Sequence, residues 1–163
     1  MIINWNKDVN TNNEIQKRIE KFIESDEQSN ININFNELRK INSDTIGYIE
    51  VANTNIKYVV VQGKDNSYYL SHNFEKKKNI AGWIFMDYKN KADGTDKNLV
   101  IYGHDTSDGT MFGSLSNLLE EKRIKNKDNL IINFVTDQSL KKYKIFSIYT
   151  IKPVEEIFHR SNI

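Results

Sequence analysis

The 163-residue sequence contains no cysteine and only one proline, Pro153. The lack of cysteine excludes a disulfide framework, a thiolate metal site and a cysteine nucleophile within these residues. An excess of charge of one sign is also lacking, because 23 Lys and Arg residues stand against 22 Asp and Glu residues and leave a formal net charge of +1. No overall field therefore attracts nucleic acid or an anionic membrane, so any partner must be recognised by local contacts.

Long apolar runs are absent as well. No segment approaches the roughly 18 to 20 apolar residues that cross a bilayer. The start, MIINWNKDVNTNNE, turns polar too soon for the apolar part of a signal peptide. The hydrophobic share of 38%, with 11% aromatic residues, supports one domain with a sizeable core. We therefore expect a single soluble domain over residues 1–163.

Helical periodicity marks the beginning of the chain. The segment NNEIQKRIEKFIES predicts an amphipathic helix, because apolar residues recur at helical spacing between charged ones. These residues are Ile15, Ile19, Phe22 and Ile23. The segment NFNELRKI predicts a shorter second helix with Asn34 or Asn36 as its cap. We expect a helical extension over about residues 1–42 and a barrel over about residues 43–163.

After Asp44 the pattern changes to short runs rich in Ile, Val, Tyr and Phe. There are six such runs, separated by clusters of Asn, Asp, Gly and Lys: TIGYIEV, IKYVVVQ, AGWIFMD, NLVIYG, NLIINFV and YKIFSIYTI. Six such runs at short spacing predict a mainly β fold, either a barrel or a sandwich. Between the fourth and fifth runs, TMFGSLSNLLEEKRI has apolar residues at helical spacing and predicts a helix that crosses from one strand to the next.

Three histidines are the candidates for proton chemistry. His72 and His159 have no acid or glycine turn beside them, so we expect surface or packing roles for both. His104 follows the apolar run LVIY, and Gly103 before it permits a turn or a close backbone approach. A side chain held at the end of a rigid strand and facing a loop is well placed for proton transfer near neutral pH. By local spacing alone, a simple turn role for His104 stays equally open.

Several motifs together resemble the class B sortases of Gram-positive bacteria. LRKINSDTIGYIEVANTNIKYVVVQGKDNSYYLSHNF is followed by AGWIFMDYKN and then by NLVIYGHDTSDGTMFGSL. In the family's order these stretches hold a Gly-aromatic-Ile strand, N-x-x-Y-x-V-x-Q, D-N-x-x-Y-L, I-F-x-D, and Y-G-H followed by M-F. The match runs from about Leu38 to about Tyr149, and the amphipathic N-terminal helix resembles the helical extension of class B members.

The resemblance implies a closed β-barrel and a cysteine transpeptidase that needs no cofactor and no metal. In the family, a thiolate attacks the threonine carbonyl of a surface protein's C-terminal sorting signal, and an amine of the cell wall or of a pilin subunit releases the acyl group. His104 falls on the catalytic histidine, which is expected to protonate the leaving amine and to deprotonate the incoming one. Asn66 and Leu70 fall on positions that line the sorting-signal groove. The match to the loop that covers the groove, around Ile157 and Phe158, is too loose to assign residues there.

The resemblance also implies a place at the extracellular face of the cell membrane, with membrane anchoring only through a segment outside these 163 residues. The family's cysteine strand and the following strand, which carries an arginine, have no counterpart, and Arg160 does not occupy the arginine's place. We therefore expect the sequence to be C-terminally incomplete, with the last strands missing, and the chain by itself to be inactive. Val59 stands where relatives usually carry proline, and Asp105 where they often carry Asn or His.

Two other functions stay open. The missing cysteine favours a non-catalytic β-barrel binding module at the cell surface. The adjacent His104 and Asp105 are both competent metal ligands, as a metal-dependent hydrolase would need. Neighbouring residues on an extended chain point to opposite sides, however, and no second His-rich cluster completes a site.

Overall fold

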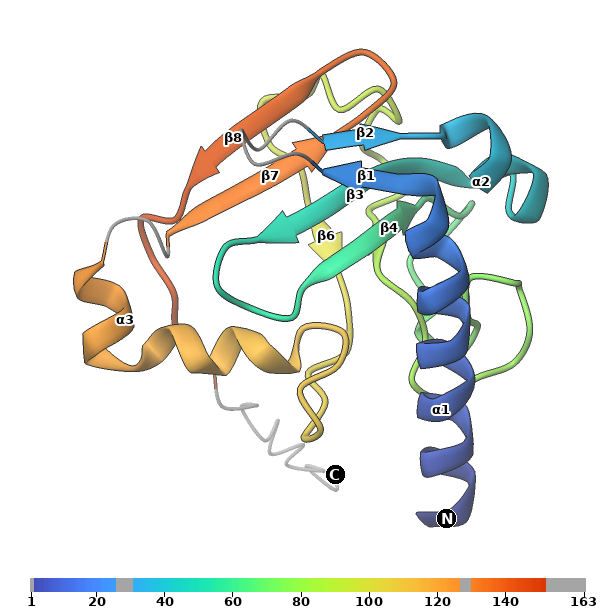
Figure 1. The fold of residues 1–163 in the computed structure, drawn as a ribbon, viewed down its shortest axis with the longest axis horizontal. Helices are drawn as coiled ribbons and strands as arrows, with labels where there is room; N and C mark the ends of the chain where they lie inside the picture. Colours follow the sequence, from blue (N-terminus) through green and yellow to red (C-terminus); the bar gives the residue numbers. More distant parts are fainter. Residues whose placement is uncertain (1, 26–30, 127–129, 152–163) are drawn as a thin grey trace, which may run out of the picture.

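A computed structural model of the protein describes residues 2–25, 31–126 and 130–151. A curled β-sheet forms the body of the molecule, α1 (Ile2–Ile19) stands along one side of it, and a second helical segment crosses below the sheet (Figure 1). The other helices are α2 (Phe35–Ile41), α3 (Glu121–Lys125) and the 3-10 helices η1 (Glu20–Phe22), η2 (Tyr68–Leu70) and η3 (Gly113–Leu119).

The strands of the described residues form two sheets. A small hairpin pairs β1 (Ile23–Ser25) with β2 (Ile31–Ile33). The main sheet has six strands in the order β6-β5-β4-β3-β7-β8. Its members are β3 (Thr45–Val51), β4 (Lys57–Val61), β5 (Phe85–Met86), β6 (Ile101–Tyr102), β7 (Ile131–Val135) and β8 (Leu140–Lys144).

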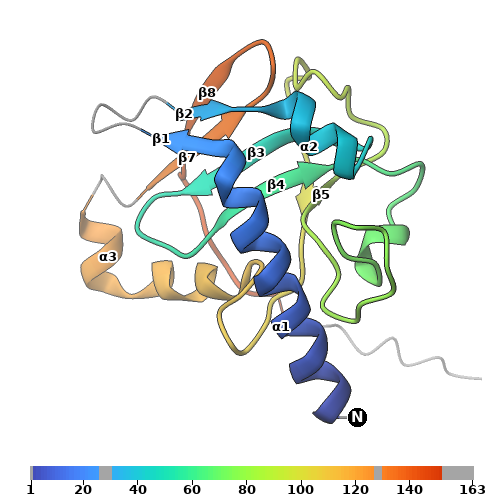
Figure 2. The ribbon, with the colours of Figure 1, turned by 45° about the vertical axis from the view of Figure 1, so that its right-hand side comes forward.

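The centre of the main sheet is the antiparallel pair β3–β4, which is buried on both faces. Val59, Val60 and Val61 are fully buried, and β-branched side chains suit such a doubly covered strand. The pair β4–β5 is the parallel one, and a parallel pair needs a long connection. That connection, residues 62–84, contains η2 and runs beside α1 in both ribbon views (Figure 2).

The expectation of a mainly β fold with an N-terminal helix is confirmed. Among the described residues the sheet is a curled half-barrel, with β6 and β8 at its two edges. The first, second and fifth sequence runs match β3, β4 and β7, whereas the third and fourth contain strands of only two residues. The sixth run is displaced, because β8 covers residues 140–144 and residues 145–151 form no described strand.

The helices also differ from the sequence pattern in two places. Phe22 and Ile23 lie beyond the end of α1, where the chain enters the unpredicted β1–β2 hairpin, and both still pack against the core. The crossover is not one helix, because Glu120 has an extended backbone, with φ −65° and ψ 127°, between η3 and α3. In η3 the Ser116 hydroxyl donates to the Gly113 carbonyl at 2.9 Å, a local bond that competes with α-helix formation.

The second helix follows its prediction closely. The Asn34 side chain accepts a hydrogen bond from the Glu37 backbone N–H at 3.2 Å and so caps α2, which begins at the next residue. The choice between Asn34 and Asn36 is thereby settled in favour of Asn34.

Candidate functional site

His104 lies two residues after the end of β6 and is half-buried. Its ring Nε2 is 2.7 Å from the backbone oxygen of Leu70, at the end of η2. A carbonyl oxygen only accepts hydrogen bonds, so Nε2 carries the proton and donates it to Leu70. Among the described residues Nδ1 has no hydrogen-bond partner, which leaves it open to a ligand.

Two glycines bring the chain close to this histidine. Gly82 has a positive φ of +58°, and a Cβ built on it would lie 3.0 Å from His104 Cδ2 and 2.5 Å from the Tyr69 backbone oxygen. A Cβ on Gly103 would lie 2.3 Å from Ile84 Cδ1. Position 82 therefore requires glycine, because it approaches backbone atoms, whereas Gly103 approaches the end of a side chain. The sequence pattern indicated a close approach only for Gly103.

Leu70 meets His104 directly, through its backbone, while its side chain remains 42% exposed. Asn66 is connected to the same region through Asp87. The Asn66 amide donates to Asp87 Oδ2 at 2.8 Å, and the Tyr102 hydroxyl donates to the same oxygen at 2.9 Å. Tyr102 lies two residues before His104 on the extended chain, so Asn66 is tied to the strand that ends at the histidine.

The carboxylate of Asp87 is held in its charged form. The Lys89 backbone N–H, together with the Asn66 amide and the Tyr102 hydroxyl, lowers the pKa of Asp87. The same hydrogen bond to Asp87 raises the pKa of Tyr102. Asp87 is therefore an acceptor that fixes Asn66 and Tyr102, and the sequence pattern did not single it out beyond the I-F-x-D match.

An apolar groove of about 500 Å³ opens on the concave side of the sheet near His104. Phe112 lines its end, and the Phe112 backbone N–H donates to the His104 carbonyl oxygen at 2.9 Å. The remaining walls come from β3, β6 and the residues before it, η3, β7, β8 and the chain after β8, among them Ile49, Leu99, Ile101, Ile132, Phe134 and Ile145. Phe146 at its rim is 99% exposed. This groove was not predicted from the sequence.

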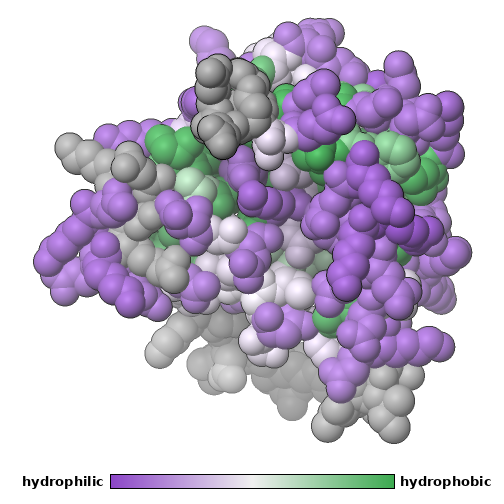
Figure 3. Space-filling model, in the orientation of Figure 1, coloured by the Kyte–Doolittle hydropathy of each residue, from purple (hydrophilic) through white to green (hydrophobic). Residues whose placement is uncertain are grey.

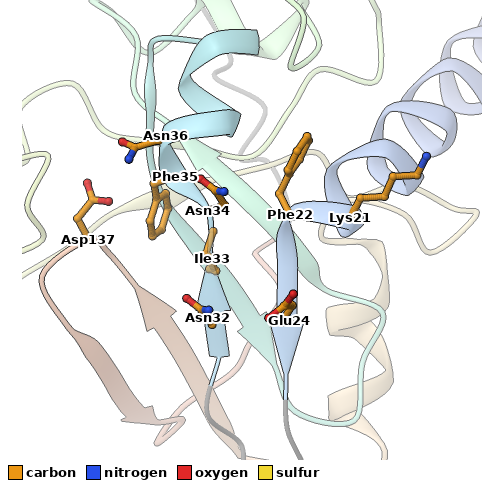
Figure 4. A pocket seen from close by; sticks show the side chains of 9 residues that line it. All are labelled: Lys21, Phe22, Glu24, Asn32, Ile33, Asn34, Phe35, Asn36 and Asp137. Atoms are coloured by element: carbon orange, nitrogen blue, oxygen red, sulfur yellow. The ribbon is translucent and has the colours of Figure 1, made fainter.

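A second, polar hollow of about 360 Å³ lies between the β1–β2 hairpin, α2 and the turn after β7 (Figure 4). Two of its polar residues already have partners in the protein, because Asn34 caps α2 and Asp137 pairs with Arg39. None of the residues singled out for chemistry line it. We therefore assign the candidate site to His104 and the apolar groove.

The other candidates have simpler surroundings. The His72 ring stacks on Tyr68, with centroids 4.0 Å apart and planes 3° apart, in agreement with a packing role. Asp105 is exposed and forms an isolated backbone bridge with Met111. Within residues 2–25, 31–126 and 130–151, no three His, Asp or Glu side chains gather as a metal site would require. Ile157, Phe158, His159 and Arg160 lie outside the described residues.

Comparison with known proteins identifies the family. Residues 49–161 match the model of the sortase domain. The chain belongs to the class B sortases. Over 117 residues, 69% of the chain, it is 40% identical to sortase B of Listeria monocytogenes and covers 45% of that protein. None of the helices in the described part of this sortase is long and apolar enough to cross a membrane.

Solved structures of sortase B have the same fold. The structure from Bacillus anthracis in complex with AAEK1 superimposes with a TM-score of 0.76 at 33% identity, covering 95% of this chain and 73% of the other. The Staphylococcus aureus sortase B–substrate complex gives 0.63 at 35% identity, over 69% of this chain and 51% of the other. The sortase chain spans about half the length of the curated relatives that it matches.

Proposed function

We propose that this chain carries the acid–base half of a transpeptidase active site, with His104 as its proton-transfer group. The whole enzyme would cleave the C-terminal sorting signal of a surface protein or pilin after threonine and join the acyl group to an amine. The observation that carries this proposal is the half-buried imidazole of His104, held by one hydrogen bond to Leu70 O beside an open groove. Family membership supplies the reaction class.

The proton transfers follow from the two ring nitrogens. A cysteine thiolate adds to the threonine carbonyl carbon, and the C–N bond breaks as the imidazolium gives a proton to the departing amine. The neutral imidazole then takes a proton from the incoming amine while that nitrogen adds to the thioester carbon and the thiolate leaves. The bond from Nε2 to Leu70 O leaves Nδ1 to exchange protons with these nitrogens.

The nucleophile must come from outside these residues, since the sequence has no cysteine. We propose that the cysteine and the oxyanion-binding arginine lie on strands of the longer protein that fill the apolar groove beside β6. Two features support this. The groove is lined by apolar side chains that are costly to leave in water, and β6 pairs with β5 alone among the described strands.

We further propose that Asn66 and Leu70 contact the sorting-signal peptide. The exposed side chain of Leu70 offers apolar surface next to His104, and Asn66 keeps one amide hydrogen for a ligand after donating to Asp87. The reaction joins proteins to the cell wall or to pilins, so the enzyme would act at the extracellular face of the membrane. Sortase B of Staphylococcus aureus forms a complex with its substrate, and its similarity to this chain supports a substrate-binding role here.

The test begins with the native protein. Intact mass and thiol labelling of the gene product should reveal a longer chain with a reactive cysteine. That protein should cleave members of a quenched fluorescent peptide library with threonine at the cleavage position, in the presence of an amine acceptor. His104→Ala should abolish turnover, while His72→Ala, a change at the stacked histidine, should retain it. Turnover that survives His104→Ala refutes the proposed role.

The absence of cysteine favours one other function, a non-catalytic module that binds a peptide in the apolar groove. This alternative becomes the better one if the native protein also lacks cysteine but still binds peptides from the same library, as measured by fluorescence anisotropy.

A further inference from the structure

One buried polar residue interrupts the apolar face of α1. Val9, Ile15 and Ile19 form a buried stripe at helical spacing, and Asn12 lies between them with only 3% of its surface exposed. Asparagine is a poor helix former and is costly to bury without partners. The opposite face of the helix is hydrophilic (Figure 3), so the burial of Asn12 is specific to the docked side.

The partners of Asn12 lie in a single loop, residues 79–82. Its amide nitrogen donates to the Gly82 carbonyl at 3.0 Å and, more weakly, to Asn79 Oδ1 at 3.4 Å. One turn earlier, Asp8 Oδ2 accepts from the Ile80 backbone N–H at 2.8 Å, and the Asp8 carbonyl accepts from the Asn79 amide at 2.9 Å. Helix α1 thus binds the start of this loop through Asp8 and its end through Asn12.

The loop in turn touches the candidate site. Gly82 lies so close to the site that a Cβ on it would come within 3.0 Å of both His104 Cδ2 and the Leu70 carbonyl oxygen. These two groups belong to the hydrogen bond that orients the imidazole. The next residue, Trp83, donates its backbone N–H to the Tyr69 carbonyl at 2.9 Å and fixes the loop against η2. A displacement of Gly82 therefore changes the packing against both groups of this hydrogen bond.

We propose that Asn12 is a positioning residue for His104. Through Gly82 it fixes the distance between the imidazole and the Leu70 carbonyl, and so keeps the proton on Nε2 and Nδ1 turned to the substrate. The effect of Asn12 on turnover rests on the proposed function of His104. The effect of Asn12 on the orientation of the imidazole does not depend on that function and can be measured in the 163-residue chain.

The experiment observes the Nε2–H proton of His104 by ¹H–¹⁵N spectroscopy at pH 8.5, above the usual titration range of histidine. Asn12→Leu keeps the side-chain volume and the apolar packing but removes the donor to Gly82. Losing one ordinary hydrogen bond corresponds to about a fivefold change in an opening equilibrium, so exchange of this proton with water should accelerate about fivefold. Exchange of the His72 ring proton should be the same in Asn12→Leu and the wild type.

Asn13→Leu is the matched control, because Asn13 is the next residue of α1 and is exposed. It should leave the His104 proton as in the wild type. Equal exchange rates for His104 in Asn12→Leu and the wild type overturn the proposal. Should Asn12→Leu fail to fold, Asp8→Ala and Asp8→Asn decide. Asp8→Asn keeps an acceptor for the Ile80 N–H, whereas Asp8→Ala does not. Faster exchange of the His104 proton in Asp8→Ala but not in Asp8→Asn supports the positioning. Wild-type exchange rates in both variants refute it.

Turnover separates this proposal from the proposed function. In the native, longer protein, Asn12→Leu should lower kcat about fivefold, because it disturbs the hydrogen bond that orients the catalytic imidazole. Loss of activity in His104→Ala combined with full activity in Asn12→Leu overturns the positioning and leaves the function standing. Activity that survives His104→Ala overturns the function, while the exchange measurement still judges the positioning.

Discussion

Replacing Gly82 by alanine measures how much stability the close packing of Gly82 against His104 contributes. Two costs add. The first is the left-handed backbone, with φ +58°, which penalises alanine by about 1–2 kcal/mol. The second is steric, because the new Cβ would lie 2.5 Å from the Tyr69 carbonyl oxygen, a backbone atom with little freedom to move.

The steric cost has a definite size. Relief of the contact separates Tyr69 O from the Trp83 N–H, 2.9 Å away, and Leu70 O from the His104 ring, 2.7 Å away. Two hydrogen bonds of about 0.5–1.5 kcal/mol each are then weakened or lost. We expect Gly82→Ala to lower the free energy of unfolding by about 2–5 kcal/mol.

The control is Gly109→Ala. Gly109 also has a positive φ, +78°, but a Cβ there would meet no atom within 4 Å. It should cost about 1–2 kcal/mol, the backbone term alone. Urea unfolding of both variants at pH 7, followed by far-UV circular dichroism, gives the difference directly if the slopes agree. Equal losses for the two variants would refute the close packing of Gly82 against the site.

Three further outcomes are expected. Burial raises the pKa of Asp44, but hydrogen bonds from Tyr69 and Lys76 and the charge of Lys76 outweigh burial, so the pKa lies below its usual value of 3.8. The ionised Asp44 therefore stabilises the fold above pH 3.8, and this stabilisation is lost as the pH falls through the pKa of the folded state. Asp44→Asn should therefore flatten the decline in unfolding free energy below about pH 4, and an unchanged acid profile would contradict this. Because β6 is an edge strand, the isolated chain should exchange backbone hydrogens faster at residues 98–102 than in β4 and should form dimers in analytical ultracentrifugation. Slow exchange at residues 98–102 in a monomer would contradict an open edge. The isolated chain should also transfer no peptide at high concentration, and turnover abolished by His104→Ala would show that a thiol is not needed.

The strands that the sequence predicted best are those whose burial is simplest. β3 and β4 are rich in β-branched and aromatic residues, most of which are buried, so local composition and final environment agree. β1 was absorbed into a helical pattern, since Phe22 and Ile23 continue the spacing of α1, and β2, also three residues long, lay in no predicted element. Apolar spacing reports which side chains are buried, but not whether the backbone has already left the helix.

The sequence predicted the histidine of the candidate site but not the residues that hold the histidine in place. The strand end and the glycine before His104 are local signals. Its hydrogen-bond partner is a backbone carbonyl 34 residues away, which leaves no trace in side-chain chemistry. Asn12 did carry a signal, a polar residue between apolar ones on the α1 stripe, but it becomes meaningful only once the opposing loop is in view.

The docking of α1 onto residues 79–82 also has a consequence for protein synthesis. Asn12 and Gly82 are separated by 70 positions, so a ribosome adding about 5–20 residues per second delivers the loop roughly 4–14 s after the helix. A lone helix of this length is only marginally stable in water and relaxes within about a microsecond. For seconds, therefore, the apolar stripe of α1 stays uncovered on the nascent chain. A chaperone that shields amphipathic segments would therefore meet α1 before the loop that covers it has been synthesised.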